Sequence, residues 1–300
     1  MKNSKSLYTS LIFFFFISGQ LFSPGNLIAG NSEAPFIYKV LPAGTHFYCG
    51  DNKEGFAFLA GELLLCAEGI AANGRLDRDG QKEWNVPLIL AGQLYSIDKW
   101  RYFQKQSIKN HNFRVDKSSL PVLLKSPFEP KYIISPLVLT FAFLGAADGI
   151  FGYPRHKKHY NNIKSVQAMD YRMNRRDGTI YYETATTALS YGAAVSEEMM
   201  FRGILLPVMD SLYGKKTGLF ASSLIFGLLH LTNPDIDNPA YYAAQATLAG
   251  LILGWDVQKN DYRMGKAIAG HFWYDAASFT STWIANPREN PIGIKVNFEF

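Results

Sequence analysis

The sequence predicts an all-α protein, a polytopic transmembrane helical bundle with an N-terminal helical hairpin region and a short extended C-terminal tail. Hydrophobic residues make up 48% of the chain and aromatic residues 15%. Long apolar segments alternate with basic loops, and the mean hydropathy of −0.06 requires these polar loops to offset the apolar segments. One apolar segment, 184–208, carries two glutamates and an arginine, which is a costly placement in a membrane helix and typical of a functional site.

The net charge of +5 favours a membrane over nucleic acid. Lysine and arginine gather in two loops beside apolar segments, as they do on the cytoplasmic side of membrane proteins. No nucleic-acid-binding motif is present. We therefore expect the lipid bilayer as a partner and no nucleic acid.

Residues 1–30 are interpreted as a signal peptide or an N-terminal anchor. Lys2 and Lys5 precede an apolar stretch at 11–17 that is short for a spanning helix. A cleaved signal is favoured and an uncleaved anchor is the alternative. With the apolar segments that follow, this start predicts a multi-pass protein of the bacterial inner (cytoplasmic) membrane.

Residues 31–98 are predicted to form a membrane hairpin region, because two apolar runs, 55–72 and 86–97, flank a polar link. The region is similar to small Pro-Gly, Phe-Tyr-x-Gly membrane hairpins appended to bacterial envelope proteins. His46 in this region is expected in a loop or at the membrane interface. Residues 99–131 are polar and basic and are interpreted as a linker.

Residues 132–285 form the predicted core, and 286–300 the extended tail. The core opens with a spanning candidate at 132–153 and a second basic loop at 154–177. Both flanks of that candidate are basic, so the positive-inside rule leaves its orientation open. Alternation of apolar and polar residues at 294–300 predicts one strand. Further helices are expected at 181–212, 218–231, 239–257 and 264–285.

Glu197, Glu198 and Arg202 share one helix of the core. Glu198 and Arg202 are four residues apart with the acid on the N-terminal side, which is the favourable orientation for an ion pair. Glu197 is rotated by about a quarter turn from Glu198. Arg202 is therefore expected to pair with Glu198 and to leave Glu197 available as a general base.

The same four-residue spacing recurs in two later helices. Phe226 and His230 share one helix face, and so do His271 and Asp275. Each pair alone has an ordinary structural interpretation, a buried histidine or a local hydrogen bond. Their joint occurrence with the glutamate motif on three apolar helices indicates a site.

These motifs resemble those of the CPBP intramembrane proteases, which include CAAX prenyl endopeptidases and the abortive-infection and bacteriocin-processing proteins. The resemblance covers roughly 132–285. It implies that Glu197 and His230 activate the attacking water and that His271 and Asp275 bind the oxyanion. Many members have Asn where this chain has Asp275, so this residue is expected either to be protonated or to orient His271.

The resemblance further implies that Glu198, Arg202 and Phe226 support the catalytic residues. No cofactor is expected, since a metal-free glutamate-type hydrolysis is preferred. The alternative is a metalloprotease with Zn²⁺ held by Glu197, His230, His271 and Asp275.

The function predicted from the sequence is thus an intramembrane endopeptidase acting on a peptide or membrane-protein substrate. A catalytically silent membrane interaction or immunity protein with the same fold is the alternative.

Overall fold

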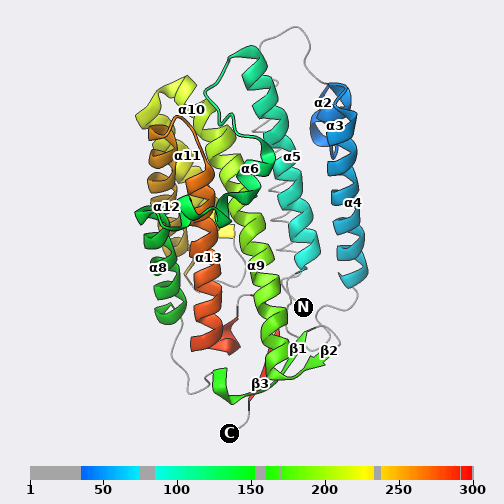
Figure 1. Ribbon diagram of the computed structural model, residues 1–300, viewed down its shortest axis with the longest axis vertical. Coiled ribbons are helices and arrows are strands. Elements are labelled where there is room, and N and C mark those ends of the chain that lie inside the picture. The colour runs from blue at the N-terminus through cyan, green and yellow to red at the C-terminus, as the bar shows by residue number, and fades with distance from the viewer. Residues whose placement is uncertain are drawn as a thin grey trace. The chain divides into compact units, whose positions relative to one another are not determined.

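The computed structural model describes residues 35–73, 85–152, 160–168, 171–232, 238–290 and 292–298 (Figure 1). The predicted signal peptide or anchor at 1–30 lies outside the described residues. The described chain is mainly helical with one small sheet, so the all-α prediction is confirmed apart from that sheet.

The helices expected at 218–231, 239–257 and 264–285 are present with bounds that differ by at most three residues, whereas the helix expected at 181–212 begins at Arg175 and is interrupted at Phe201–Leu205. The long helices are α4 (Asn52–Asn73), α5 (Val86–Asn110), α8 (Pro136–Phe151), α9 (Arg175–Met200), α10 (Leu206–Tyr213), α11 (Lys215–Leu229), α12 (Pro239–Lys259) and α13 (Gly265–Ala285). Short helices are α2 (Phe36–Val40), α3 (Gly44–Tyr48), α6 (Leu120–Lys125) and α7 (Pro130–Ile133). The strands are β1 (Ile163–Ala168), β2 (Tyr171–Met173) and β3 (Lys295–Phe298).

The chain forms two compact units, each assembled from three segments. The first unit comprises Met1–Leu63, Ala91–Leu124 and Val195–Ala267. The second comprises Leu64–Leu90, Lys125–Ala194 and Ile268–Phe300. Each unit is described by itself, and the domain boundaries predicted from the sequence stay a prediction.

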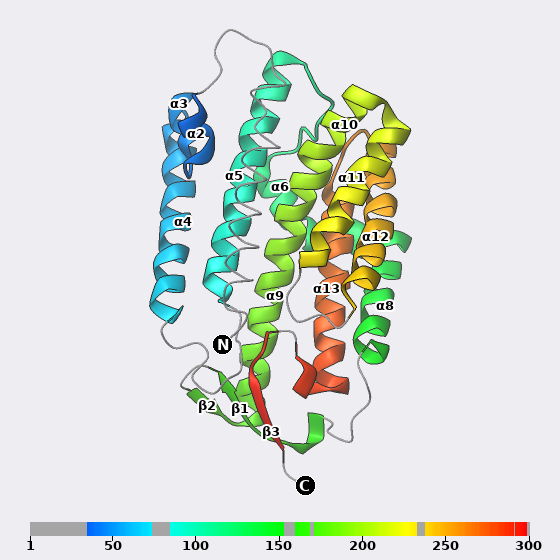
Figure 2. The ribbon, with the colours of Figure 1, turned by 180° about the vertical axis from the view of Figure 1, so that it is seen from behind.

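In the first unit, α11 packs directly against α12, and Figure 2 shows the two helices side by side. Gly214 precedes α11 with a φ of 80°, a left-handed conformation that suits glycine. Gly227 faces the backbone of Ala243 so closely that a side chain there would meet its carbonyl oxygen at 2.5 Å. Small residues therefore permit the close approach of these two helices.

Two carboxylates, the half-buried Asp210 and the buried Asp116, fix the ends of helices in the first unit. Asp210 accepts hydrogen bonds from Gln258 at 2.8 and 2.9 Å and from the Tyr262 hydroxyl at 2.6 Å. Asp116 accepts the backbone N–H of Met264 at 2.7 Å, just before α13 begins. These bonds satisfy backbone and side-chain groups that would otherwise be costly to bury.

The second unit has a core in which Tyr182 of α9 stacks on Trp283 of α13, with ring centroids 4.3 Å apart. The Tyr182 hydroxyl donates to the carbonyl of Phe279 at 2.9 Å. An antiparallel sheet of order β2-β1-β3 joins this core, and Val166 of β1 is fully buried in it. The sheet thus closes one side of the aromatic core.

Two expectations about polar segments were wrong. The second basic loop, 154–177, contains β1 and β2, whose short alternation is masked by the surrounding charges. The expected linker from residue 99 begins as a helix, because α5 continues to Asn110. Trp100 and Phe103 are completely buried there and give the basic segment an apolar face. The strand expected near the C-terminus is confirmed as β3.

In the described part of the chain, one helical stretch, Asn52–Ala72 in α4, is long and apolar enough to cross a membrane, with a mean hydropathy of 1.6. Helix α8 is apolar but shorter, and its 16 residues rise about 24 Å, less than the ~30 Å hydrocarbon core. A polytopic bundle therefore stays a prediction.

Candidate active site

Glu198 and Arg202 form the ion pair that their spacing predicts. The Nη1 atom of Arg202 lies 3.0 Å from Oε1 of Glu198, and the two side chains are 3% and 0% exposed. The guanidinium group also lies over the Phe226 ring, 4.4 Å from its centroid. Removing two charges from water is expensive unless they are held in good geometry, so this pair is a rigid feature of the first unit.

Glu197 is half-buried beside this pair. The electrostatic attraction of Arg202 to Glu198 is larger than its attraction to Glu197. The arginine is therefore committed mainly to Glu198, as the helical geometry predicts.

A π turn, Phe201–Leu205, begins three residues after Glu198 and connects α9 to α10. All five of its residues are buried. Single π turns inside helices are rare and frequent at functional sites. The available sequence signal for this turn is Pro207, which has no N–H to donate to the carbonyl of Gly203 four residues earlier and so interrupts the helical hydrogen bonds.

His230 lies at the end of α11, one helical turn after Phe226. Its Nδ1 atom is 2.9 Å from the Phe226 carbonyl oxygen, and the two rings are 4.7 Å apart. Because a carbonyl can only accept, Nδ1 carries the proton, and in the neutral ring Nε2 keeps its lone pair. His230 is half-buried and is thus chemically set to accept a proton at Nε2.

His271 and Asp275 lie in the part of α13 that belongs to the second unit. Nε2 of His271 is 3.6 Å from Oδ2 of Asp275, and the side chains are 12% and 21% exposed. The carboxylate is close enough to orient a protonated imidazole, although the distance is long for a hydrogen bond. The predicted site residues therefore fall into two groups. Five of them lie in the first unit (Glu197, Glu198, Arg202, Phe226 and His230), and these two lie in the second.

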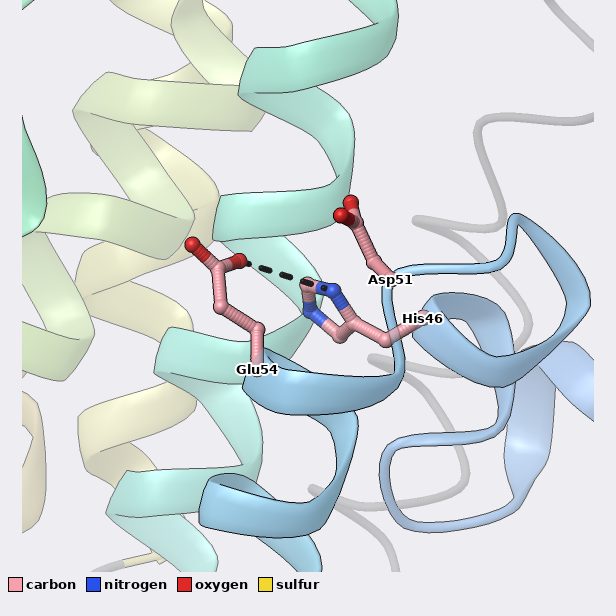
Figure 3. A group of neighbouring side chains, drawn as sticks. All are labelled: His46, Asp51 and Glu54. Atoms are coloured by element: carbon pink, nitrogen blue, oxygen red, sulfur yellow. Dashed lines mark ion pairs between the residues drawn. The ribbon is translucent and has the colours of Figure 1, made fainter.

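A separate charged cluster in the first unit was missed by the sequence analysis. Figure 3 shows His46, Asp51 and Glu54, whose ligand atoms lie within 4.8 Å of one another. The ammonium group of Lys105 lies 2.6 Å from Asp51 Oδ2 and 2.8 Å from Glu54 Oε2. This hydrogen bond lowers the pKa of Asp51 below its ordinary value. An internal cation thus occupies the position between these carboxylates, which favours an ion-pair cluster over a metal site.

The expected placement of His46 in a loop or at the membrane interface was wrong. The residue lies in α3 and is 1% exposed, with Nε2 3.0 Å from Oδ1 of the fully buried Asp98. Oδ2 of Asp98 also lies 2.9 Å from Nζ of Lys99 and accepts a hydrogen bond from the backbone N–H of Ala43 at 3.3 Å. The available signal in the sequence was the presence of Asp98, Lys99 and Lys105 on one helix, α5. Their partners could not be identified, because they come from a distant segment.

Residues 184–277 match a family model described as Rce1-like, type II CAAX prenyl endopeptidase Rce1-like. The matched segment contains the three motifs and confirms the resemblance to the CPBP proteases. The model covers less than half of the chain, and α5 lies outside it. Neither the curated proteins nor the solved structures gave a match. The family is membrane-embedded, and the match implies CAAX-type protease activity.

Proposed function

From this match to the Rce1-like family, we propose that the chain is an intramembrane endopeptidase in which Glu197 and His230 activate a water molecule. The observation that carries the proposal is which ring nitrogen of His230 is hydrogen-bonded and which is left available. Its Nδ1 atom is committed to the Phe226 carbonyl at 2.9 Å, so the neutral ring offers Nε2 as a proton acceptor. The buried Glu198–Arg202 pair supports this arrangement through the Phe226 ring.

In the proposed reaction, the carboxylate of Glu197 takes a proton from water while Nε2 of His230 accepts a hydrogen bond from the same water. The resulting hydroxide attacks the carbonyl carbon of the scissile peptide bond, and negative charge develops on the carbonyl oxygen. Glu197 then returns its proton to the leaving amine as the C–N bond breaks. All protons are thereby accounted for without a further co-reactant.

His271 is proposed to stabilise the oxyanion as a hydrogen-bond donor. An ionised Asp275 in direct contact with the oxyanion would repel it. The 3.6 Å separation of the two side chains supports the other role, in which Asp275 orients the ring of His271.

Zinc chemistry is the alternative to this glutamate-type mechanism. Glu197, His230, His271 and Asp275 are the residues that would hold Zn²⁺, and the ion would supply Lewis-acid activation of water. A neutral Nε2 on His230 suits either mechanism. Metal analysis of the purified protein distinguishes them, because stoichiometric zinc lost together with activity would overturn the metal-free mechanism.

The decisive experiment compares peptides released from membranes of cells that express the wild type, Glu197→Ala or His230→Ala. Peptides released by the wild type alone are expected, and they identify the substrate. The control is Glu183→Gln, on the same helix α9, where the new amide oxygen still accepts from Thr280. This control is expected to cleave normally. Equal cleavage by the wild type and both alanine variants would remove the proposed mechanism.

A second experiment follows from the family description, which names a prenyl endopeptidase. Prenylated and unprenylated synthetic peptides are offered to the purified protein, and their cleavage is compared. We propose peptide-bond hydrolysis and assign no prenyl requirement. If only prenylated peptides are cleaved, the substrate class narrows to that of the family description.

A further inference from the structure

We propose that Trp100 of α5 is a positioning residue for the candidate active site. Its indole packs on the π turn and through that turn holds Arg202 and His230 in place. The catalytic consequence rests on the proposed function, whereas the packing itself can be tested without any activity.

The contact that carries the proposal joins Trp100 to Gly203, the middle residue of the π turn. A side-chain carbon on Gly203 would lie 2.5 Å from Cδ1 of Trp100 and even closer to its Nε1 atom. The same carbon would meet Sδ of Met264 at 3.0 Å. Gly203 therefore has no room for a side chain, and the indole fixes the position of the turn's backbone.

The π turn connects Trp100 to the charged and catalytic groups through a series of contacts. Arg202 directly precedes Gly203, pairs with Glu198 at 3.0 Å and covers the Phe226 ring at 4.4 Å. The backbone carbonyl oxygen of Phe226 in turn accepts a hydrogen bond from Nδ1–H of His230 at 2.9 Å. The contacts from Trp100 to His230 thus form an unbroken path, and every residue in it belongs to the first unit.

The burial of Trp100 is costly. The side chain is 0% exposed, and its Nε1 atom has no hydrogen-bond partner among the described residues. A buried donor without a partner lowers stability, so an apolar side chain of the same shape would be buried here at less cost. The fit of the indole against Gly203 accounts for this placement. Helix α5 is therefore part of the site, although it lies outside the matched segment.

The first test replaces Trp100 by Leu in the full-length protein and measures cleavage of a peptide identified with the wild type. We expect kcat to fall by about tenfold or more while KM changes by less than about threefold, because misplaced catalytic groups impair the reaction more than binding. Trp100→Phe is expected to retain more activity than Trp100→Leu. The matched control is Phe103→Leu, on the same helix and equally buried, whose ring contacts Phe113 at 5.4 Å.

The second test measures coupling between the two contacting residues. Gly203→Ala is expected to reduce kcat strongly in the wild type, because the new methyl group collides with the indole. In the Trp100→Leu background the same change is expected to cost less, since the colliding atoms are gone. Additive losses would contradict the proposed contact.

The third test is independent of activity and measures amide hydrogen exchange of a peptide that covers Phe201–Leu205. Trp100→Leu is expected to accelerate exchange there by about tenfold, and Phe103→Leu is expected to leave it nearly unchanged. Equal exchange in both variants would overturn the proposal even if the protein has no protease activity. If the wild type cleaves and Trp100→Leu shows the same kcat as Phe103→Leu, the positioning role fails while the proposed function stands.

Discussion

Replacing Arg202 by Met tests whether the Glu198–Arg202 pair is the rigid centre of the motif. The variant would leave the carboxylate of Glu198, which is 0% exposed, without the cation 3.0 Å away. Removing one partner of a buried ion pair typically costs about 3–5 kcal/mol, because the other charge stays buried and uncompensated. Loss of the cation–π contact with Phe226 adds to the destabilisation and keeps the expected value near the upper end, about 5 kcal/mol.

Thermal unfolding of the full chain in detergent micelles measures this effect. For a chain of 300 residues, 1 kcal/mol shifts Tm by roughly 1.5–2 °C, so a decrease of about 8 °C is expected for Arg202→Met. The control is Lys266→Met, which breaks the pair with Asp256 at 2.7 Å in the same unit. That lysine is 29% exposed and the Asp256 side chain 11%, so water partly compensates the loss, which is expected to cost about 1–3 kcal/mol, less than Arg202→Met.

A double variant, Glu198→Leu with Arg202→Met, separates the stability of the pair from its role in the site. Replacing both charges by apolar residues of similar size is expected to recover most of the lost stability. Cleavage is expected to remain impaired, because the group that holds the Phe226 ring is missing. The reasoning is refuted if Arg202→Met is no less stable than Lys266→Met, or if the double variant is no more stable than Arg202→Met.

Three further predictions concern packing and surface charge. Gly227→Ala is expected to destabilise the α11–α12 contact by about 1–3 kcal/mol, because the methyl group collides with Thr247, and thermal unfolding measures this loss. Trp283→Ala is expected to cost about 3–5 kcal/mol in the same assay, because the residue is 1% exposed in its core. A double-mutant cycle on Asp51 and Lys105 is expected to give about 0.2–1 kcal/mol at pH 7, since the Asp51 side chain is 45% exposed and water screens the pair. Lys105 lowers the pKa of Asp51, so this coupling is present above the unfolded value of 3.8 and is lost as pH falls through the lower folded value.

Sequence spacing predicted those contacts that helix geometry alone determines. Glu198 and Arg202 are four residues apart on one helix, and their side chains meet at 3.0 Å. His271 and Asp275 have the same spacing and lie 3.6 Å apart. In both cases the partner is local, so knowledge of the helix is sufficient.

Contacts between distant segments could not be predicted in this way. The π turn depends on packing against Trp100, which lies in a segment that composition alone marks as polar and basic. The cation–π contact of Arg202 requires that α11 approach the motif helix, and only the assembled unit shows this approach. Strand β1 was missed partly for a related reason, since one of its two partners, β3, is more than a hundred residues away.

Two histidines of the first unit, the buried His46 and the half-buried His230, show how partners decide between a structural and a catalytic role. Nε2 of His46 faces the carboxylate of Asp98 at 3.0 Å, and a carboxylate requires a donor at that atom. His230 instead donates from Nδ1 to a backbone carbonyl, which leaves the lone pair of a neutral ring on Nε2. His46 in α3 therefore suits an ion pair. His230 at the end of α11 suits the activation of water, because hydrolysis needs a proton acceptor. Sequence context could not separate the two, because the deciding atom in each case belongs to the residue's partner.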